Sequence, residues 1–506
     1  MPVRCILPTL CLVVLLLSGC TGGGGTSATA DPRIGFTYPD PADYSALSWT
    51  DAFQAAHDKF SREYAFSAWK EVDWPGLYDR FLPRIAQAQA AGDEKAYYLA
   101  LHEYICSIPD GHISLSATNT TVPMTLAKEL AGGGFGMAVA ELDDGRVITA
   151  AVIPDSPAAQ AGIAAGAEIV TWGGVPAETA IGGIDVGAIP FKALTGAFGN
   201  ENPKATLVFN RLEQARLLTR GPVGSSVQVS FKNLGQSSPQ TATLTAVDDA
   251  GRSFSLLNFA SRPDLSDQVD YRILPEGYGY VLVRMELDLS NPGGYPTRVY
   301  QQFREAVASF VAAGVSGVIV DLRGNYGGSD QLAADLSGFF YSSPVFYEMQ
   351  EYFDKRTGQF LRITASENSP NPIVDSISIE PQQPYYGGNM VALVNPGTTS
   401  SGEGPALAIA RLPKGSVIGF HGTNGSFGMV GGMIKMPGGY TIGYPFGRSV
   451  DRNGVVQLDS RNGAGGVPPN LRVRKTLENV LAFVAGTDVE LQFAIKFLDD
   501  IAPYRP

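Results

Sequence analysis

Ser400 stands at a junction where serine hydroxyls often act as nucleophiles. The run 390–394 has the composition of a buried strand, and Asn-Pro-Gly at 395–397 ends it before a predicted helix. The first turn of a helix has unpaired N–H donors and the positive end of the helix dipole, so an oxyanion formed beside Ser400 would be stabilised there. Serine is also a common N-cap, and this position alone therefore leaves a purely structural role open.

A second loop, 321–328, would lie at the same edge of the sheet. Its sequence is Asp-Leu-Arg-Gly-Asn-Tyr-Gly-Gly, and it follows a strand pattern at 317–320 and precedes a helical pattern at 331–336. If the two strands run parallel, their carboxyl ends meet at one edge, which is where open α/β sheets bind ligands. The final pair of glycines would let the backbone approach a ligand closely, and Asp321 and Arg323 could hold the loop through a charge-assisted pair.

The two loops together resemble those of the carboxyl-terminal processing (tail-specific) peptidases. Those enzymes have an Asp-Leu-Arg-Gly-Asn-x-Gly-Gly loop, which matches this second loop, and a Thr-Ala-Ser-Ala-Ser-Glu loop, which matches 398–403. The resemblance implies that Ser400 is the nucleophile and that the N–H groups of Gly328 and Ser401 form the oxyanion hole. Gly402 replaces the second serine of the family pattern, a change that affects the support of the loop and not the attacking atom.

The resemblance also indicates a general base. One branch of the family uses a lysine shortly after the nucleophile, but the corresponding stretch 419–428 contains none. The branch that includes the tricorn core uses a histidine from an Asp-Gly-His-Thr-like motif, which Asp-Gly-His-Ile-Ser at 110–114 resembles. His112 is therefore the expected base. His421 is an alternative because imidazole titrates near neutral pH, and Lys435 is a weaker one because it would have to be desolvated.

A histidine base needs an acceptor that fixes its tautomer, which predicts a carboxylate downstream of Ser400. Asp459 is the candidate, because it precedes the segment 465–470, which resembles the family's Gly-Val-x-Pro-Asp segment near the third triad member. Glu403 and Asp451 remain alternatives, and a turn-capping role for Asp459 also stays open.

Segments upstream of these loops resemble a PDZ domain. Gly-Phe-Gly-Met at 134–137 precedes a strand pattern, and Ser-Pro-Ala-x-x-Ala-Gly at 156–162 would start a helix. The resemblance implies that Phe135, Gly136 and Met137 bind peptide, with N–H groups facing a terminal carboxylate and an extended peptide added as a strand. A β-rich structural domain that binds nothing is the alternative.

The positions of these motifs predict a multidomain α/β protein. Apolar and aromatic residues spaced among charges predict helices at 46–107. His112 would then lie just after the end of a helical domain. A helical face at 299–311 ends at Gly314, and a strand-helix-strand order runs from 278 to 420. The resemblance implies a ClpP/crotonase-like α/β protease core. The predicted order is a signal peptide (1–19), a lipidated cysteine and tether (20–38), an N-terminal helical domain (39–125), a PDZ-like β-rich domain (126–250), a serine peptidase core (265–485) and a C-terminal tail (486–506).

The first residues predict export and a lipid anchor. An apolar run at 6–17 follows Arg4 and leads into Leu-Ser-Gly-Cys, the pattern of a lipobox. The run is too short for a stable span, and Cys20 would become the lipidated first residue of the mature chain. Because no aspartate directly follows Cys20, we expect a lipoprotein of the bacterial cell envelope in the outer membrane. Cys106 would then be the remaining cysteine, so no intrachain disulfide could form.

Composition limits the partners. The chain has 506 residues, 44% of them hydrophobic, and a formal net charge of −12. Such a length predicts about three domains at roughly 150 residues each, and the negative charge disfavours nucleic acid and anionic lipid. No phosphate-binding or dinucleotide glycine motif is present, and Cys106 with His102 and His112 is too small a set for zinc. We therefore expect no cofactor and no metal. The resemblance to the tail-specific peptidases implies that the substrates are proteins or peptides.

These patterns predict a lipid-anchored serine endopeptidase that cleaves unstructured polypeptides. His112 would deprotonate Ser400, and Asp459 would orient His112. The alternative is a catalytically inactive, peptide-binding lipoprotein with a decayed protease core, in which the missing lysine and the loosely placed acid mark lost chemistry. An esterase of the α/β-hydrolase type is less well supported, because Thr398 and not glycine stands two residues before Ser400.

Overall fold

The computed structural model describes residues 38–191, 193, 205–260, 268–291, 294–362 and 376–501. The predicted signal peptide, Cys20 and all but the last residue of the predicted tether lie outside these ranges, as does the end of the predicted tail. Within the described ranges, no helix combines the length and the apolar character needed to cross a membrane.

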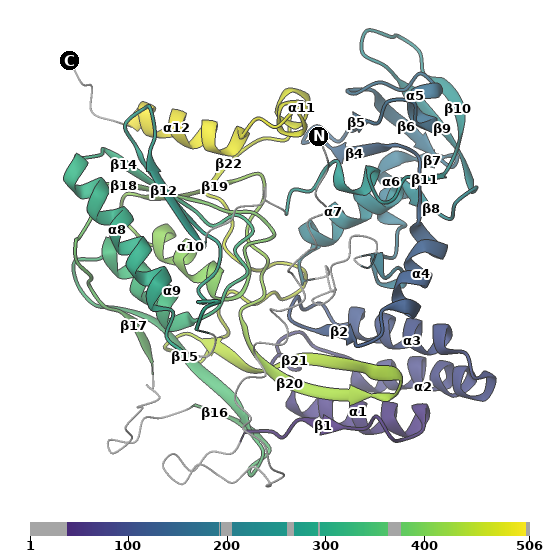
Figure 1. Cartoon of the computed structure of the whole chain (residues 1–506), viewed down its shortest axis with the longest axis horizontal. Helices are drawn as coiled ribbons and strands as arrows, with labels where there is room; N and C mark the ends of the chain where they lie inside the picture. Colours follow the sequence, from purple (N-terminus) through teal and green to yellow (C-terminus); the bar gives the residue numbers. More distant parts are fainter. Residues whose placement is uncertain are drawn as a thin grey trace.

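In the described part of the chain, a six-stranded sheet forms the centre of the core, at the left of Figure 1. Its strands lie in the order β12, β13, β14, β18, β19 and β22, and the strands from β13 to β22 pair in parallel. The strand bounds are β12 Val269–Ile273, β13 Gly279–Val283, β14 Gly317–Asp321, β18 Asn389–Leu393, β19 Gly415–Gly419 and β22 Leu471–Arg472.

Helices cover both faces of this sheet (Figure 1). Successive side chains of a strand point to opposite faces, so Val318 and Val320 pack in the apolar cluster of α8, α9 and α10, while Ile319 packs in that of α11 and α12. This burial on both faces explains the continuous apolar sequence of β14. As predicted, α8 ends at Gly314, which has φ +62°. The helix bounds are α8 Thr297–Ala313, α9 Asp330–Ser337, α10 Glu403–Ala410, α11 Leu477–Val484 and α12 Val489–Ile501.

The parallel pairing of β14 with β18 brings two loops together. Asp321 lies opposite Leu393 in the register of these strands, so the loops that follow them leave the sheet at the same edge. This arrangement confirms that the residues after 317–320 and 390–394 are neighbours. It also places them at the carboxyl ends of parallel strands, where open α/β sheets bind ligands.

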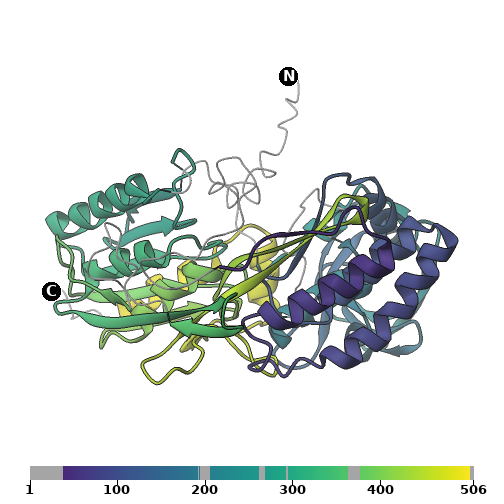
Figure 2. The same cartoon turned by 90° about the horizontal axis from the view of Figure 1, so that it is seen from below.

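A long hairpin of β20 and β21 extends from the core lobe to the N-terminal helices (Figures 1 and 2). In the described residues, this sheet has the order β1, β20, β21, β15 and β16, with β2 also paired to β21 and β17 to β15. The strand bounds are β1 Ala42–Asp43, β2 Ser114–Ala117, β15 Val345–Asp354, β16 Gln359–Arg362, β17 Ile377–Ile379, β20 Gly428–Met436 and β21 Tyr440–Val450.

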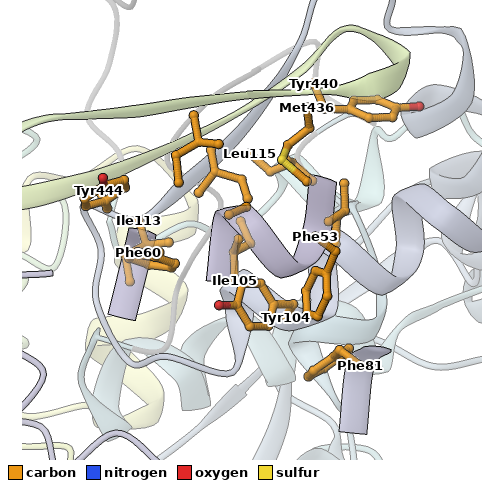
Figure 3. Close-up of a cluster of buried hydrophobic side chains, with 14 of the residues drawn as sticks. Phe53, Phe60, Phe81, Tyr104, Ile105, Ile113, Leu115, Met436, Tyr440 and Tyr444 are labelled. Carbon is orange, nitrogen blue, oxygen red and sulfur yellow. The ribbon is translucent and has the colours of Figure 1, made fainter. Parts of the chain in front are cut away.

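The N-terminal helices share one apolar cluster with this hairpin. Figure 3 shows Phe53, Phe60 and Tyr104 gathered with Met436 and Tyr444, although the helical and hairpin residues are more than 300 positions apart. The segment predicted as an N-terminal helical domain contains helices and also short strands, and part of the apolar cluster around its helices comes from distant strands. The helix bounds are α1 Trp49–Glu63, α2 Trp74–Ala91 and α3 Glu94–Cys106.

A β-rich region follows, at the upper right of Figure 1. Its larger sheet has the order β10, β9, β6, β5 and β4 with β7 beside β6, and its smaller sheet has the order β11, β3 and β8. Val139 and Ile169 pack inside this region, whereas Ala140 and Ile148 pack in one cluster with Val480 of α11. The bounds are α4 Thr121–Ala131, β3 Gly133–Gly134, β4 Met137–Glu141, β5 Val147–Val152, α5 Pro157–Gln160, β6 Glu168–Trp172, β7 Val175–Pro176, α6 Ala177–Gly182, α7 Leu207–Leu218, β8 Arg220–Gly221, β9 Ser226–Lys232, β10 Gln240–Thr245 and β11 Val247–Asp248.

Candidate active site

Ser400 lies in a sharp turn between β18 and α10. Its φ angle is +56°, a conformation that non-glycine residues seldom adopt, and its side chain is half-buried. Two backbone hydrogen bonds hold the turn: the N–H of Ser400 donates to the carbonyl of Ser426 at 2.9 Å, and the N–H of Thr399 donates to the carbonyl of Asn325 at 2.9 Å. Backbone strain of this kind persists only where the surroundings enforce it, and it is frequent at reactive sites.

The two glycines that end the second loop approach the Ser400 turn closely. A Cβ atom added to Gly327 would lie 2.4 Å from Cβ of Ser400 and 2.9 Å from the backbone nitrogen of Ser401. A side chain at this position would therefore obstruct the space in front of the Ser401 N–H. Gly328 has φ +152°, and a Cβ atom there would lie 2.4 Å from the carbonyl oxygen of Glu286. The loop thus requires glycine at both positions for steric reasons.

Gly402 departs from the family pattern, and glycine is required at this position too for a steric reason. A Cβ atom at this position would lie 2.4 Å from Oδ1 of Asn325. The Asn325 side chain is fixed there, because its Oδ1 accepts the N–H of Gly327 at 2.8 Å and its Nδ2 donates to Val283 and to Oε1 of Glu286. The glycine makes room for an amide that ties the two loops together.

The predicted pair of Asp321 and Arg323 is present at the base of the second loop. Their charged groups lie 2.6 Å apart and are largely buried. Arg323 also donates to Asp488 and to Glu490 at the start of α12, at 2.7 and 2.9 Å. Nearby carboxylates raise the pKa of Arg323 against the opposing effect of its burial. The guanidinium therefore stays charged and fixes the loop to the far helix layer.

A four-residue segment, 424–427, connects the loops of all three predicted triad residues. The Ser426 carbonyl accepts the N–H of Ser400, and its Oγ accepts the N–H of Gly111 at 3.0 Å. The next N–H, that of Phe427, donates to Oδ2 of Asp459 at 2.9 Å. Ser426 thus joins the turn of the predicted nucleophile directly to the residue before the predicted base, His112.

His112 is buried at the end of a short turn after α3. Its N–H donates to Oδ1 of Asp110 at 2.7 Å, and Oδ2 of Asp110 accepts the hydroxyl of Tyr64 at 2.6 Å. Burial lowers the pKa of His112 below its ordinary value, and Lys70 lowers it further, while Asp110 acts in the opposite direction. The ring is therefore neutral over a wider pH range than a solvated histidine. Its Nδ1 atom is buried without a hydrogen-bond partner among the described residues.

Asp459, the predicted acid, is paired with a residue that sequence reasoning did not consider. Its Oδ1 lies 2.5 Å from Nζ of Lys70, and both side chains are almost wholly buried. Burial raises the pKa of Asp459 above its ordinary value in spite of the adjacent ammonium, and the charge of Asp110 adds to the rise. None of the hydrogen bonds found among the described residues joins this carboxylate to the ring of His112. The structure thus places Asp459 in the same network as His112, but in contact with Lys70.

Lys70 links three segments. Besides Asp459, its ammonium donates to the carbonyl of Pro109 at 3.0 Å and to the carbonyl and Oγ of Ser460 at 2.9 and 2.8 Å. The indole of the preceding Trp69 donates to the carbonyl of Asp459 at 3.1 Å. No local pattern marks this lysine, because it lies in a turn of mixed composition and its partners are distant in the sequence.

Glu403 and Asp451, the alternative acids, have other roles. Glu403 is fully buried, and its carboxylate accepts the N–H groups of Gly425 and Ser426 and the hydroxyl of Thr423. Burial raises its pKa to about 8. Asp451 caps its own exposed turn by accepting the N–H of Val455. Glu403 therefore supports the 424–427 segment, and Asp451 supports a surface turn.

The alternative bases lie away from this network. His421 is buried against the Phe259 ring, with 5.7 Å between the ring centroids, and lines a cavity of about 560 Å³ that α7 borders. Burial lowers its pKa to about 3. None of its contacts in the described residues involves the Ser400 turn. Lys435 is exposed on β20 and faces Asp43 at 3.5 Å.

Of the predicted peptide-binding residues, Phe135 and Gly136 lie between β3 and β4, and Met137 is the first residue of β4. Phe135 is buried with its ring edge-on to Trp172, and its N–H donates to the carbonyl of Thr219 at 3.2 Å. The side chain of Met137 is fully buried in the same cluster. The Phe135 N–H is thus already engaged within the β-rich region. In the described residues, β4 lies at one end of the strand order of its sheet.

Comparison with known proteins gives a family for the core. The model of Peptidase family S41 matches residues 282–473. No curated protein sequence matches the chain. The structure of mature CPAF has a TM-score of 0.57 and 13% identity, and the match covers 90% of this chain and 98% of that chain. Mature CPAF complexed with lactacystin gives 0.56 and 13%, with 90% and 99% covered.

A further similar structure is the photosystem II D1 C-terminal processing protease, with a TM-score of 0.37 and 17% identity over 88% of this chain and 99% of that chain. The similarity to CPAF shows a shared fold across the described regions. The family match covers the β14 and β18 loops and the segment that joins them to Asp459. Residues 282–473 therefore form a Peptidase family S41 domain, and the protein is a peptidase.

Proposed function

We propose that the protein is a serine endopeptidase in which Ser400 is the nucleophile and His112 the general base. The observation that carries this proposal is the bridge through Ser426, which accepts hydrogen bonds from the backbone of Ser400 and of Gly111. The backbone carbonyl of Ser426 thus holds the Ser400 turn, and its side-chain hydroxyl holds the residue next to His112. Nucleophile and base must lie within hydrogen-bond reach in the substrate complex, and such a shared anchor favours that geometry.

The reaction follows from these positions. His112 accepts the hydroxyl proton as Oγ of Ser400 attacks the peptide carbonyl, and the N–H groups of Gly328 and Ser401 donate to the resulting oxyanion. The protonated imidazole then gives its proton to the leaving amine, and the C–N bond breaks. Water, deprotonated by His112, hydrolyses the acyl-enzyme and restores Ser400.

Asp459 is the proposed acid of this triad. Its carboxylate is fixed by the N–H of Phe427, one residue from the Ser426 bridge. The Lys70 ammonium, 2.5 Å away, favours the ionised carboxylate, which would stabilise the imidazolium that forms during attack. Asp459 would act on His112 through Nδ1, the ring atom that has no partner in the described residues.

The remaining parts of the proposal concern substrate and location. The β-rich region would act as a PDZ-like domain that binds unstructured polypeptide, with strand addition at β4 as its mode. The lipobox-like sequence before Cys20 supports a lipoprotein anchored in the bacterial cell envelope, in the outer membrane. Anchoring would confine cleavage to polypeptides close to the membrane.

The test compares the full chain, purified in detergent, with its Ser400→Ala and Ser342→Ala variants on a reduced and alkylated protein substrate. Ser342 is exposed and serves as the matched control. We expect cleavage by the wild type and by Ser342→Ala, and none by Ser400→Ala at equal folded concentration, checked by circular dichroism. Cleavage by Ser400→Ala at the wild-type rate would overturn the assignment of the nucleophile. Substrate binding without cleavage by all three proteins would instead favour a peptide-binding lipoprotein.

A further inference from the structure

The side chain of Ser401 makes contacts that the reaction described above does not use. Its Oγ atom lies 2.9 Å from the carbonyl oxygen of Gly328 and 2.7 Å from Oδ1 of Asp330. Ser401 is 2% exposed, so no solvent replaces these partners. The family pattern described above has alanine at this position, and the hydroxyl is therefore a property of this chain.

The location of these contacts matters because the two proposed oxyanion donors come from different loops. Gly328 follows β14, whereas Ser401 follows β18. Donors stabilise an oxyanion well only when each lies about 2.7–3.1 Å from it, so the separation of the loops has to be held within a fraction of an ångström. The contact from Ser401 to Gly328 joins the two donor residues themselves.

Asp330 is in turn held by residues behind the site. Its Oδ2 accepts Nε2 of Gln350 at 3.1 Å, and the same amide donates to Oε1 of Glu348 at 2.6 Å. Asp330 is also the first residue of α9, where Ser329 caps the helix by accepting the N–H of Leu332. The carboxyl group that receives the Ser401 hydroxyl is thus attached to a helix end and to β15, and not to a free loop.

We propose that Ser401 and Asp330 are positioning residues that set the distance between the two N–H donors of the oxyanion hole. This inference rests on the proposed function, because it requires Ser400 to be the attacking residue. Its consequence is specific: loss of the hydroxyl affects the transition state, in which the oxyanion exists, and leaves the binding of the uncleaved peptide unchanged.

The first experiment measures kcat and KM on a fluorogenic peptide for Ser401→Ala, Asp330→Ala, the double variant and Asp330→Asn. We expect Ser401→Ala to lower kcat by about 10- to 100-fold with KM within about twofold, as for a displaced donor. Asp330→Ala should show the same loss, and the double variant should lose no more than either single variant, because Asp330 acts through Ser401. Asp330→Asn retains an acceptor oxygen and should recover most of kcat.

A second measurement separates this role from a general loosening of the fold. The Kd of an uncleaved peptide is compared between Ser400→Ala and the double variant Ser400→Ala with Ser401→Ala, alongside thermal unfolding of both. Equal Kd values together with a reduced kcat for Ser401→Ala support positioning. A weakened Kd that accounts for the whole loss of kcat/KM overturns it.

The outcomes also distinguish the inference from the function on which it rests. Wild-type kcat in Ser401→Ala, with Ser400→Ala inactive, overturns the positioning role and leaves the nucleophile in place. Additive losses from Ser401→Ala and Asp330→Ala overturn the link between those two residues. Full activity of Ser400→Ala overturns the proposed function, and the positioning role falls with it.

Discussion

The two sides of the proposed active site are held in different ways. On the nucleophile side, backbone N–H groups, the Asn325 amide and the Glu403 carboxyl fix the Ser400 turn. On the base side, the turn that carries His112 is held through the Lys70 ammonium, which contacts Asp459 and the carbonyl of Pro109. The first side is built within residues 282–473, whereas the second joins residues about 390 positions apart.

This difference indicates which substitutions should destabilise each side. Hydrogen bonds between backbone groups survive most single substitutions, because every residue has a backbone acceptor and every residue except proline has a backbone donor. A buried ion pair depends on one side chain at each end, and removal of either leaves an uncompensated charge. We therefore expect that substitution of a single charged residue destabilises the base side, and that loss of an acceptor oxygen destabilises the nucleophile side.

The largest expected effect is the loss of the base itself. His112→Ala should lower kcat/KM by about 10²- to 10⁴-fold, the range that a general base contributes. His421→Ala is the matched control, because His421 is also buried but contacts Phe259 on the border of a separate cavity. Initial rates with a fluorogenic peptide give the comparison. Equal losses in the two variants would contradict the assignment of His112.

The next effect tests the ion pair of the base side. Lys70→Met keeps the length of the side chain but leaves the Asp459 carboxyl buried without its cation, so the free energy of unfolding should fall by about 3–5 kcal/mol. Lys435→Met is the control, since the exposed pair of Lys435 with Asp43 should contribute less than about 1 kcal/mol. Urea unfolding at pH 7 measures both. Similar losses of unfolding free energy in the two variants would show that the Lys70 ion pair does not stabilise the base side.

A smaller effect is expected on the nucleophile side. Both oxygens of the Glu403 carboxyl group accept backbone N–H groups. Glu403→Gln keeps the size of the side chain but replaces one of these oxygens by an NH₂ group, so at least one buried donor of the 424–427 segment loses its partner. The free energy of unfolding should fall by about 1–3 kcal/mol. Urea unfolding again gives the value, and Glu305→Gln on the exposed face of α8 is the control. No change relative to this control would mean that Glu403 does not hold the segment.

The smallest effect concerns pH. A general base must be unprotonated, and burial lowers the pKa of His112 below 6.5. The acidic limb of kcat/KM should therefore have its midpoint below 6.5, so the enzyme keeps activity where a solvated histidine would already be protonated. Lys70→Met removes one cause of the shift and should move the midpoint upward. A wild-type midpoint above 6.5 would contradict the burial of the base.

The lowered pKa of His112 also makes the free energy of unfolding depend on pH, and the direction of this dependence can be stated. Below pH 6.5 the unfolded chain binds a proton at His112 that the folded chain does not yet bind, so this group favours unfolding as the pH falls from 6.5 to its folded pKa. Above 6.5 both states are neutral at this residue, and its contribution is constant. His112→Gln should therefore be less sensitive than wild type to acid in that window, as measured by urea midpoints.

Much of the nucleophile side could be predicted from local sequence. The strand patterns before Ser400 and Asp321 have buried β-branched residues, and parallel pairing then requires the loops to meet. The pair of Asp321 and Arg323 lies two residues apart, so its spacing is visible in the sequence as well.

The base side could not be predicted in this way. Lys70, the hydrogen bonds of segment 424–427 and the place of the β20–β21 hairpin against α1 depend on packing between distant segments. A lysine in a turn has the same local pattern whether it is solvated or buried. The sequence predicts a role only for the backbone N–H of Ser401. The role of its hydroxyl could not be predicted, because its partner Asp330 lies on another helix.

The apolar cluster shared by the first helices and the β20–β21 hairpin has a consequence for the order in which the protein becomes active. Phe53 and Phe60 are made long before Met436 and Tyr444, and the Lys70 contacts require residues near 460. Such long-range contacts form late, because chain closure over hundreds of residues has to come first. A growing chain therefore carries its histidine turn without the partners that position it. Because His112 is the proposed base, we expect the site to be complete only after the residues near 460 have been made and have packed against the first helices.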